Sequence, residues 1–329
     1  MEPLLVLALL VSFLLTLFFT PIWIRKAQQI GLVWEDMNKV GHPKNVGGSG
    51  GIGVMLGFAL GVLVYIAIKT FYFKTTDTII GTFTVLTTIL MVGFIGFMDD
   101  LLGWQKGGLS KRSRLTLLIC AAVPLMVVNA GSSVMLGINF GILYPLLLIP
   151  LAVVGVSATY NFLAGYNGLE AGQGIIILSA LTFVAWKTGN SWLSVISLIM
   201  VASLIAFYFF NKNPAKVFPG DVMTYSIGAL IAAIAILGNI EKIAAFFFIP
   251  YIIEVILKSR GRLKKHSFAK VNKDGSLEMP YDRIYGLEHL AIYILKRIKP
   301  SKKVYETNVV YLINGFQILV IIIGILFVL

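Results

Sequence analysis

Residues 78–100 read TIIGTFTVLTTILMVGFIGFMDD, an uncharged apolar run that ends in two adjacent carboxylates. A helix crosses the core of a bilayer in about 20 residues, so this run predicts a membrane-spanning helix. Comparable uncharged runs recur along the 329 residues. The expected fold class is therefore all-α, in the form of a polytopic integral membrane protein.

The composition excludes several other classes of protein. Hydrophobic residues make up 58% of the chain and charged residues only 13%, whereas an ordinary globular protein is about a quarter charged. A water-soluble enzyme, a disordered chain and a fibrous protein are thereby excluded. The single Cys120, inside an apolar run, excludes a disulfide framework and a cysteine-based metal site.

About ten transmembrane helices are expected from these runs. They lie at residues 3–24, 50–69, 78–97, 115–129, 141–160, 173–187, 191–210, 222–238, 243–257 and 307–328. The runs at 115–129, 173–187 and 243–257 are short for about 20 residues of bilayer, so a re-entrant segment is an alternative for one of them.

The basic residues are divided unevenly between alternate loops. With the N-terminus placed outside, only Lys69, Lys74, Lys187 and Lys242 of the 27 Lys and Arg fall in outer loops. Because Lys and Arg favour cytoplasmic loops, both termini are expected outside a cell membrane and the basic loops inside. The net charge of +12 then needs no nucleic-acid partner. The polar motifs fall on the basic side, so an active site facing the cytoplasm is expected.

The chain is expected to form one integral membrane domain, residues 1–329, with one large cytosolic loop at 258–306. Within this loop, Asn272-Lys-Asp-Gly275 predicts a turn that joins two short strands. Residues 283–298 carry apolar side chains at helical spacing with basic residues among them. This pattern predicts an amphipathic helix lying on the membrane surface, in contact with membrane lipids.

Asp99 and Asp100 form the first candidate site. Two adjacent carboxylates at the end of an apolar helix repel each other, and burying either without a partner is costly. A Mg²⁺ ion, a lysine or a bound proton would relieve the repulsion. The alternative is a solvated helix end without chemistry.

The segment 161–174 reads NFLAGYNGLEAGQG and is rich in amides and glycines. Asn161, Asn167 and Glu170 supply polar side chains, and glycines such as Gly165 allow backbone amides to approach a ligand closely. The segment is therefore a candidate ligand-binding loop, with a plain connection between helices as the alternative.

Phe218-Pro-Gly-Asp221 places an acid at the start of an expected helix. Asp221 is either an N-cap, a common use of aspartate, or a metal ligand, or both. Oxygen ligands of this kind suit Mg²⁺, with Mn²⁺ as the alternative, and do not suit zinc.

Two further segments are rich in glycine or in basic residues. Residues 47–61 place glycines four apart at 53, 57 and 61, which predicts close helix packing in a membrane rather than a phosphate-binding loop. The basic run 262–270 contains Lys265 and His266, and its alternative use is binding of lipid headgroups. His42 and His289 are assigned no role.

Acids and amides that suit Mg²⁺, basic loops that suit phosphates and a membrane face together indicate phosphoryl transfer to or from a lipid. Three motifs, Asp99-Asp100, Asn161-x-x-x-Gly-x-Asn-Gly-Leu-Glu170 and Phe218-x-Gly-Asp221, occur in this order. They resemble the polyprenyl-phosphate N-acetylhexosamine-1-phosphate transferase superfamily. The Asn-Gly-Leu-Glu form is similar to the eukaryotic and archaeal UDP-GlcNAc:dolichyl-phosphate GlcNAc-1-phosphotransferases.

The resemblance implies a role for each site residue. Asp221 and Asn161 would hold Mg²⁺, and Asp99, with Asp100 beside it, would deprotonate or orient the lipid phosphate. The substrate-binding residues implied are Lys39 and Arg114 near the phosphates, Gly165 and Asn167 at the uracil, Phe218 stacked on it, Glu170 in the same motif, and Lys265 with His266 at the phosphate and sugar. Lys265 stands where the family carries arginine, and Lys44-Asn45 stand where it carries an acid.

The function this implies is transfer of GlcNAc-1-phosphate from UDP-GlcNAc to a polyprenyl or dolichyl phosphate, the first step of lipid-linked oligosaccharide synthesis. One alternative is a transporter or scramblase, which predicts charged residues lining a path through the membrane. Only Glu254 lies well inside an expected span, and this argues against the alternative. Another is a CDP-alcohol phosphotransferase, which needs more closely spaced aspartates. The sequence leaves open which hexosamine is transferred and how long and how saturated the lipid chain is. It also leaves open whether a covalent intermediate forms and whether the protein is a homodimer.

Overall fold

The computed structural model describes residues 3–129, 133–135 and 137–327. In this part of the chain, seven helices are long and apolar enough to cross a membrane. They are α1 (Val6–Ile30), α2 (Gly51–Ala67) with its π-helical extension η2 (Ile68–Tyr72), α3 (Ile79–Lys106), α7 (Leu169–Lys187), α8 (Ser191–Asn211), α9 (Gly220–Gly238) and α13 (Glu306–Phe327). The predicted all-α integral membrane class is confirmed.

The predicted count of ten spans is not confirmed, because the other three expected spans form short or interrupted helices among the described residues. They are α4 (Lys111–Ala121) with α5 (Val123–Val128), η3 (Tyr144–Leu148) with α6 (Ile149–Tyr160), and α10 (Glu241–Phe247) with α11 (Ile249–Arg260). The breaks before α5 and α11 precede Pro124 and Pro250. Proline lacks the N–H of a helical hydrogen bond and clashes with the preceding turn, which explains both interruptions.

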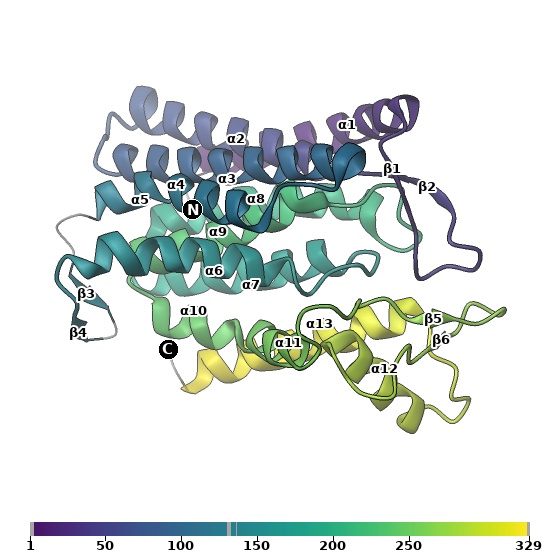
Figure 1. Ribbon diagram of the computed structural model, residues 1–329. Coiled ribbons are helices and arrows are strands. Elements are labelled where there is room, and N and C mark those ends of the chain that lie inside the picture. The colour runs from purple at the N-terminus through teal and green to yellow at the C-terminus, as the bar shows by residue number, and fades with distance from the viewer. Residues whose placement is uncertain (1–2, 130–132, 136, 328–329) are drawn as a thin grey trace.

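Helix α9 lies at the centre of the bundle and is the most buried of the seven. It packs against α2, α3, α6, α7 and α8 (Figure 1). Glycines bring its backbone close to two neighbours: a Cβ added to Gly96 of α3 would lie 2.5 Å from the Asp221 carbonyl oxygen, and one added to Gly228 would lie 2.5 Å from Ser157 Cα of α6. The start of α9 is thereby held tightly against the end of α3.

The glycine repeat of α2 packs against α1, as predicted. A Cβ added to Gly53 would meet the Thr20 hydroxyl at 2.9 Å, and one added to Gly61 would meet Ser12 Cβ at 2.9 Å. The Ser12 hydroxyl in turn donates to the Ile199 carbonyl of α8 (2.9 Å). Small residues therefore let α1, α2 and α8 approach closely, as is usual for membrane helices.

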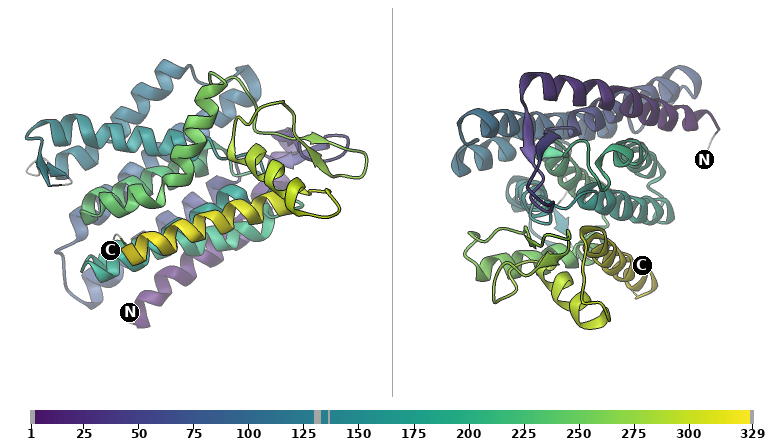
Figure 2. Two further views of the ribbon diagram at one scale, coloured as in Figure 1. Left: turned by 90° about the horizontal axis from the view of Figure 1, so that it is seen from below. Right: turned by 90° about the vertical axis from the view of Figure 1, so that its right-hand side faces the viewer.

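Short strands mark the two ends of the bundle (Figures 1 and 2). One end carries β1 (Val33–Glu35), β2 (Lys44–Gly47), β5 (Lys270–Val271) and β6 (Leu277–Glu278). The other carries β3 (Val134–Met135) and β4 (Ile138–Asn139), together with the start of α1 and the end of α13. Each pair is antiparallel, and Val33 opposes Gly47 in the first pair. The predicted turn over residues 272–275 does join two strands, β5 and β6.

The predicted amphipathic helix is present as α12 (Leu287–Ile298), which begins four residues later than expected because Gly286 is extended. Its apolar residues Leu287, Ala291 and Ile292 are buried, and the helix packs against α11 and α13. Much of the apolar face is therefore covered by protein, and contact of α12 with the membrane surface stays a prediction.

Candidate active site

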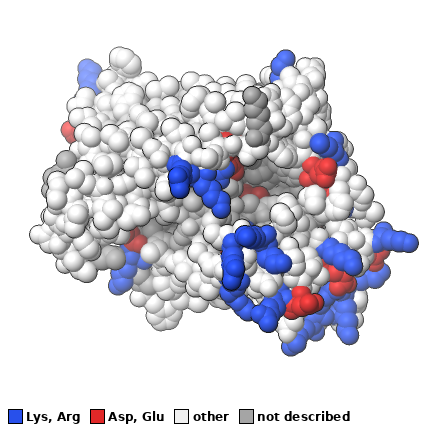
Figure 3. Space-filling model, in the orientation of Figure 1, with Lys and Arg blue, Asp and Glu red and all other residues white. Residues whose placement is uncertain are grey.

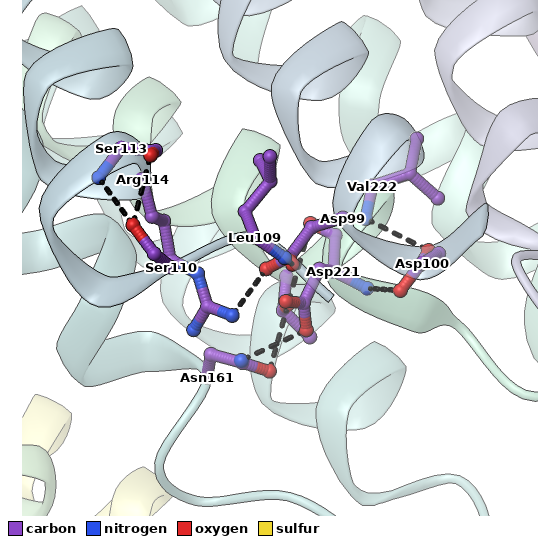
Figure 4. Close-up of polar contacts among 10 residues, drawn as sticks. Asp99, Asp100, Leu109, Ser110, Ser113, Arg114, Asn161, Asp221 and Val222 are labelled. Atoms are coloured by element: carbon purple, nitrogen blue, oxygen red, sulfur yellow. Dashed lines mark hydrogen bonds and ion pairs between the residues drawn. The ribbon is translucent and has the colours of Figure 1, made fainter. Parts of the chain in front are cut away.

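Three helix ends meet at the end of the bundle that carries β1 and β5, and each of them supplies one predicted site residue. Asp99 lies near the end of α3, Asn161 follows α6 and Asp221 lies in the first turn of α9. Asn161 Nδ2 donates to Asp221 Oδ1 (2.9 Å), and the Thr224 hydroxyl donates to Asn161 Oδ1 (3.0 Å). Figure 4 shows these side chains pointing toward one another. The structure therefore brings together residues separated by more than a hundred positions in the sequence.

The charge of Asp99 is compensated within the protein. Arg114 of α4 places Nη2 2.6 Å from Asp99 Oδ2, and the backbone N–H of Leu109 donates to Asp99 Oδ1 (2.7 Å). Asp99 is 4% exposed, and burial of an unpaired carboxylate would be costly. The turn between α3 and α4 thus delivers both a cation and an N–H group to this acid, and the predicted Arg114 lies at the site.

Asp100 has different surroundings from its neighbour. Its Oδ1 accepts the backbone N–H of Asp221 (2.9 Å) and its Oδ2 that of Val222 (3.4 Å) (Figure 4). These are among the first N–H groups of α9, which have no partner inside the helix. Asp100 therefore closes the start of α9 and holds Asp221 in place.

This arrangement answers the question of whether Asp221 is an N-cap. The N-cap position of α9 is occupied by Pro219, and no side chain of the cap residue binds the helix. The capping carboxylate comes from Asp100 on α3 instead. The capping interpretation of Asp221 is wrong, and its own carboxylate is free to face Asn161.

A cavity of about 600 Å³ opens beside these residues. The predicted residues that line it are Asn161, Gly165, Glu170, Phe218 and Asp221. Other lining residues are Trp34, Asp36, Trp104, Tyr166, Thr224 and Phe268, among others. Figure 3 shows this face hollowed near its centre, with acidic side chains in the hollow and Lys and Arg gathered on two sides of it. A cavity with acids inside and cations at its rim suits a polyanion together with a divalent cation.

The loop after α6 is shaped by hydrogen bonds to its own acid and to a distant segment. The Gly165 N–H donates to Glu170 Oε1 (2.8 Å), and the Gly165 carbonyl accepts from Asn38 Nδ2 (2.9 Å). Gly165 has φ +102°, and an added Cβ would lie 2.8 Å from the Phe268 ring, so a side chain is disfavoured there. The Gly165 amide, expected at a base, is thus already bonded to Glu170.

Asn167 and Lys39 lie in a buried network behind the cavity wall. Asn167 Nδ2 donates to Asp36 Oδ2 (2.9 Å), and its backbone N–H donates to Glu306 Oε1 (2.8 Å). The Lys39 ammonium pairs with Glu306 and lies 3.8 Å from Asp36 Oδ2. Lys39, expected at a phosphate, is therefore bound to two carboxylates.

Lys265 and His266 are not among the residues that line the cavity. Both are exposed. The Lys265 ammonium lies 4.6 Å from the centre of the Tyr281 ring and 5.8 Å from that of Tyr285. The backbone N–H of His266 donates to the Tyr281 hydroxyl (3.3 Å). The structure thus holds this pair against the aromatic side chains of Tyr281 and Tyr285, in the loop between α11 and α12.

Sequence reasoning missed several residues of this site. Asp36 lies two positions before Asn38 in a segment that the motifs single out only for Lys39, and Glu306 is the last residue of the expected loop 258–306. Trp104 and Phe268 had no periodic or motif signal that would single them out. The one sequence signal for Glu306 is its place as an acid at the very start of an apolar helix.

The oxygen atoms of this site suit Mg²⁺ better than they suit a metal ion whose ligands all come from the protein. Within the described residues, no group of three or more His, Cys, Asp or Glu could hold a metal ion. Mg²⁺ usually takes only one or two carboxylates and completes its shell with water and substrate phosphates. Asp221, with the Asn161 side-chain amide beside it, provides that smaller set.

Comparison with known proteins adds an independent line of evidence. Residues 82–239 match the family model described as glycosyl transferase family 4. A Saccharolobus solfataricus protein, provisionally named UDP-N-acetylglucosamine–dolichyl-phosphate N-acetylglucosaminephosphotransferase, is 38% identical over 294 residues, 87% of each chain. A Sulfolobus acidocaldarius protein with the same provisional name is 31% identical over 328 residues, 98% of this chain and 95% of the relative. A phospho-N-acetylmuramoyl-pentapeptide-transferase of a Geobacillus species is 29% identical over 270 residues, 78% of this chain and 82% of the relative.

Proposed function

Since the chain belongs to glycosyl transferase family 4, we propose that it transfers GlcNAc-1-phosphate from UDP-GlcNAc to a polyprenyl phosphate such as dolichyl phosphate. The products are lipid-PP-GlcNAc and UMP. The observation that carries the proposal is the meeting of Asp99, Arg114, Asn161 and Asp221 beside a cavity at the ends of membrane helices. The provisional names of the two archaeal relatives support this choice of donor and acceptor.

In the proposed reaction, an oxygen of the lipid phosphate attacks the β-phosphorus of UDP-GlcNAc. The bond from the β-phosphorus to the oxygen that bridges it to the α-phosphorus breaks, and UMP leaves with that oxygen. One phosphoanhydride is exchanged for another, so no ATP is needed. The obstacle is the repulsion between two anionic phosphates, which positioned cations reduce.

The residues of the chain divide this work. Arg114, fixed by Asp99, supplies a permanent positive charge beside the acids, and Asp99 orients the lipid phosphate or accepts its proton. Asp221 and Asn161 would hold Mg²⁺, with Mn²⁺ as the alternative, and the ion when bound would neutralise charge on the pyrophosphate. Asp100 acts through Asp221 by closing the start of α9.

The nucleotide is proposed to bind along Phe218 and the loop after α6. Phe218 lines the cavity three residues before Asp221, which allows a base stacked on its ring to lie beside the pyrophosphate. The backbone N–H and Nδ2 of Asn167 are engaged by Glu306 and Asp36. The side-chain oxygen of Asn167 is therefore the atom offered to a donor, and the imide N–H of uracil is such a donor.

We also propose the orientation of the protein in the membrane. The cavity is lined by residues of β1 and of the first turn of α9, and these elements meet at the end of the bundle opposite to the start of α1 and the end of α13 (Figure 1). The charge bias of the loops supports a cytoplasmic position for the cavity, which suits a nucleotide-sugar donor. Lys265 and His266 belong to the same basic end and stay predicted contacts of the phosphate and sugar.

A different UDP-hexosamine is the second candidate donor, because the Geobacillus relative is named as a phospho-N-acetylmuramoyl-pentapeptide-transferase. The test is release of UMP by purified protein with polyprenyl phosphate, Mg²⁺ and a panel of UDP-sugars. We expect UMP release only when both lipid phosphate and UDP-GlcNAc are present. UMP release with another UDP-hexosamine but not with UDP-GlcNAc would identify that other sugar nucleotide as the donor. The absence of UMP release with every UDP-sugar of the panel would support the transporter alternative.

A further inference from the structure

A buried carboxylate at the start of α13 joins two loops of the proposed site. Glu306 is 3% exposed and is the first residue of α13. Its Oε1 accepts the backbone N–H of Asn167 (2.8 Å), and its Oε2 pairs with the ammonium of Lys39. One side chain therefore binds the loop after α6 and the connection between β1 and β2 at the same time.

Asp36 closes this arrangement into a ring. Its Oδ2 accepts Nδ2 of Asn167 (2.9 Å) and lies 3.8 Å from the Lys39 ammonium. Asn167 is thus held at its backbone by Glu306 and at its side chain by Asp36. The connection between β1 and β2 is anchored a second time by Asn38, whose Nδ2 donates to the Gly165 carbonyl.

The free-energy cost of burying a carboxylate indicates that this ring of contacts is a specific feature of the fold. A buried carboxylate without partners is costly, and Glu306 offsets that cost with one cation and one N–H group. Breaking one partner of such a pair leaves the other charge buried and is strongly destabilising to the local arrangement. The position of Asn167 relative to the cavity therefore depends on the Glu306 charge.

We propose that Glu306 is a positioning residue for nucleotide binding, which acts by holding Asn167 and Lys39 directly behind the part of the cavity wall that Gly165 and Tyr166 line. The inference rests on the proposed function, because it takes the loop after α6 to be the part that reads the base. Glu306, Lys39 and Asp36 all lie outside residues 82–239, the region that matches the family model. The proposal therefore concerns a set of side-chain contacts that the region matched by the family model does not contain by itself.

The test is Glu306→Gln, which keeps the shape and one acceptor oxygen but removes the charge that Lys39 needs. We expect the KM for UDP-GlcNAc and the Kd for UDP to rise roughly tenfold, an effect typical of a residue that acts on a ligand through intervening residues. The KM for polyprenyl phosphate and the turnover at saturation should change far less. A KM effect confined to the nucleotide is not expected from a residue that only stabilises the fold.

The matched control is Glu241→Gln. Glu241 is also a buried acid in the first turn of a helix, and it accepts the Tyr144 hydroxyl (3.3 Å) at the opposite end of the bundle. Its loss should leave both KM values unchanged. Glu306→Asp, which keeps the charge on a shorter arm, should weaken UDP binding less than Glu306→Gln, and it serves where the glutamine variant does not fold.

A double variant shows whether Glu306 works through Lys39. Lys39→Met with Glu306→Gln should bind UDP no more weakly than the weaker single variant, because both changes remove the same ion pair. Unchanged UDP affinity in folded Glu306→Gln, or fully additive losses in the double variant, would overturn the inference. A wild-type protein that binds no UDP would overturn the proposed function itself, and the inference with it.

Discussion

Two neighbouring aspartates show how the environment of a single residue sets its role. Asp99 and Asp100 are adjacent, yet successive residues of a helix point about 100° apart. Asp99 meets Arg114 and Leu109, whereas Asp100 meets the first N–H groups of α9. A motif of two identical letters therefore contains one residue that pairs with a cation and one that positions another acid.

Asp221→Asn is expected to lower turnover at least a hundredfold while the protein stays folded. The substitution keeps the shape of the side chain but removes its charge, and loss of one well-placed electrostatic contact commonly costs about 10² to 10³ in rate. The measurement is UMP release in detergent at saturating Mg²⁺, with melting temperature as the control. Activity near that of the wild type would remove Asp221 from the proposed metal site.

The capping role of Asp100 predicts different effects of two substitutions. Asp100→Asn keeps an oxygen that accepts the Asp221 N–H, whereas Asp100→Ala leaves that N–H without a partner. Loss of a capping side chain costs about 1 kcal/mol, so the alanine variant should be the less stable by roughly that amount. Thermal unfolding of the two purified variants measures the difference, and equal melting temperatures would contradict the role.

Phe218→Ala is expected to weaken UDP binding and leave the requirement for lipid phosphate unchanged. Stacking on a base is worth about 1–3 kcal/mol, which corresponds to a loss of roughly 5- to 150-fold. Phe218→Trp, which keeps an aromatic face, is the matched control and should bind UDP nearly as well as the wild type. An increased KM for the lipid alone would place Phe218 at the acceptor instead.

At the scale of the elements, local signals were predictable and interruptions were not. Apolar runs predicted α3, α8 and α9, and a polar turn predicted the β5–β6 pair, because both signals lie in neighbouring residues. The breaks at α4–α5 and α10–α11 were missed because an uncharged apolar run can contain a proline, which interrupts the helix without adding charge. The network of Asp36, Asn167 and Glu306 was also missed, since it joins residues that only the tertiary fold brings together.

Helix α12 carries a buried histidine that should make its docking sensitive to pH. Burial, and then the positive charge of Lys258, lower the pKa of His289 from 6.5 to about 4. The undocked histidine therefore binds a proton below pH 6.5 and the docked one does not. Docking should be fully stable above pH 6.5 and weaken as the pH falls toward 4, by up to about tenfold per pH unit.

Hydrogen exchange of α12 in detergent between pH 7 and 4.5 measures this effect. The pKa of Glu288 in the same helix is raised by burial and then by the charge of Glu254, so that group works in the opposite direction. Comparison with His289→Gln isolates the histidine, because the variant keeps Glu288. If the two proteins show the same pH dependence after correction for intrinsic exchange, His289 does not control docking.

At the scale of the whole molecule, the bundle gathers separate loops at one end. The connections after α1, α3 and α8 and the loop before α13 meet beside β1 and β5, where the cavity opens (Figures 1 and 2). The sequence could predict this gathering, because alternate loops of a helical bundle lie on the same side. It could not predict which side chains inside the gathered loops would pair with one another.

The proposed orientation makes a prediction about two exposed lysines at opposite ends of the bundle. Lys187 ends α7 at the end away from the cavity, and Lys273 lies in the turn between β5 and β6 at the cavity end. Cys120 is exposed, so both sites are tested in a Cys120→Ser background. Lys187→Cys should react with a membrane-impermeant maleimide on intact cells, and Lys273→Cys only after permeabilisation. Because a charged maleimide cannot cross the bilayer, the reverse pattern would place the cavity outside the cell, where the proposed nucleotide donor would have to be supplied from the external medium.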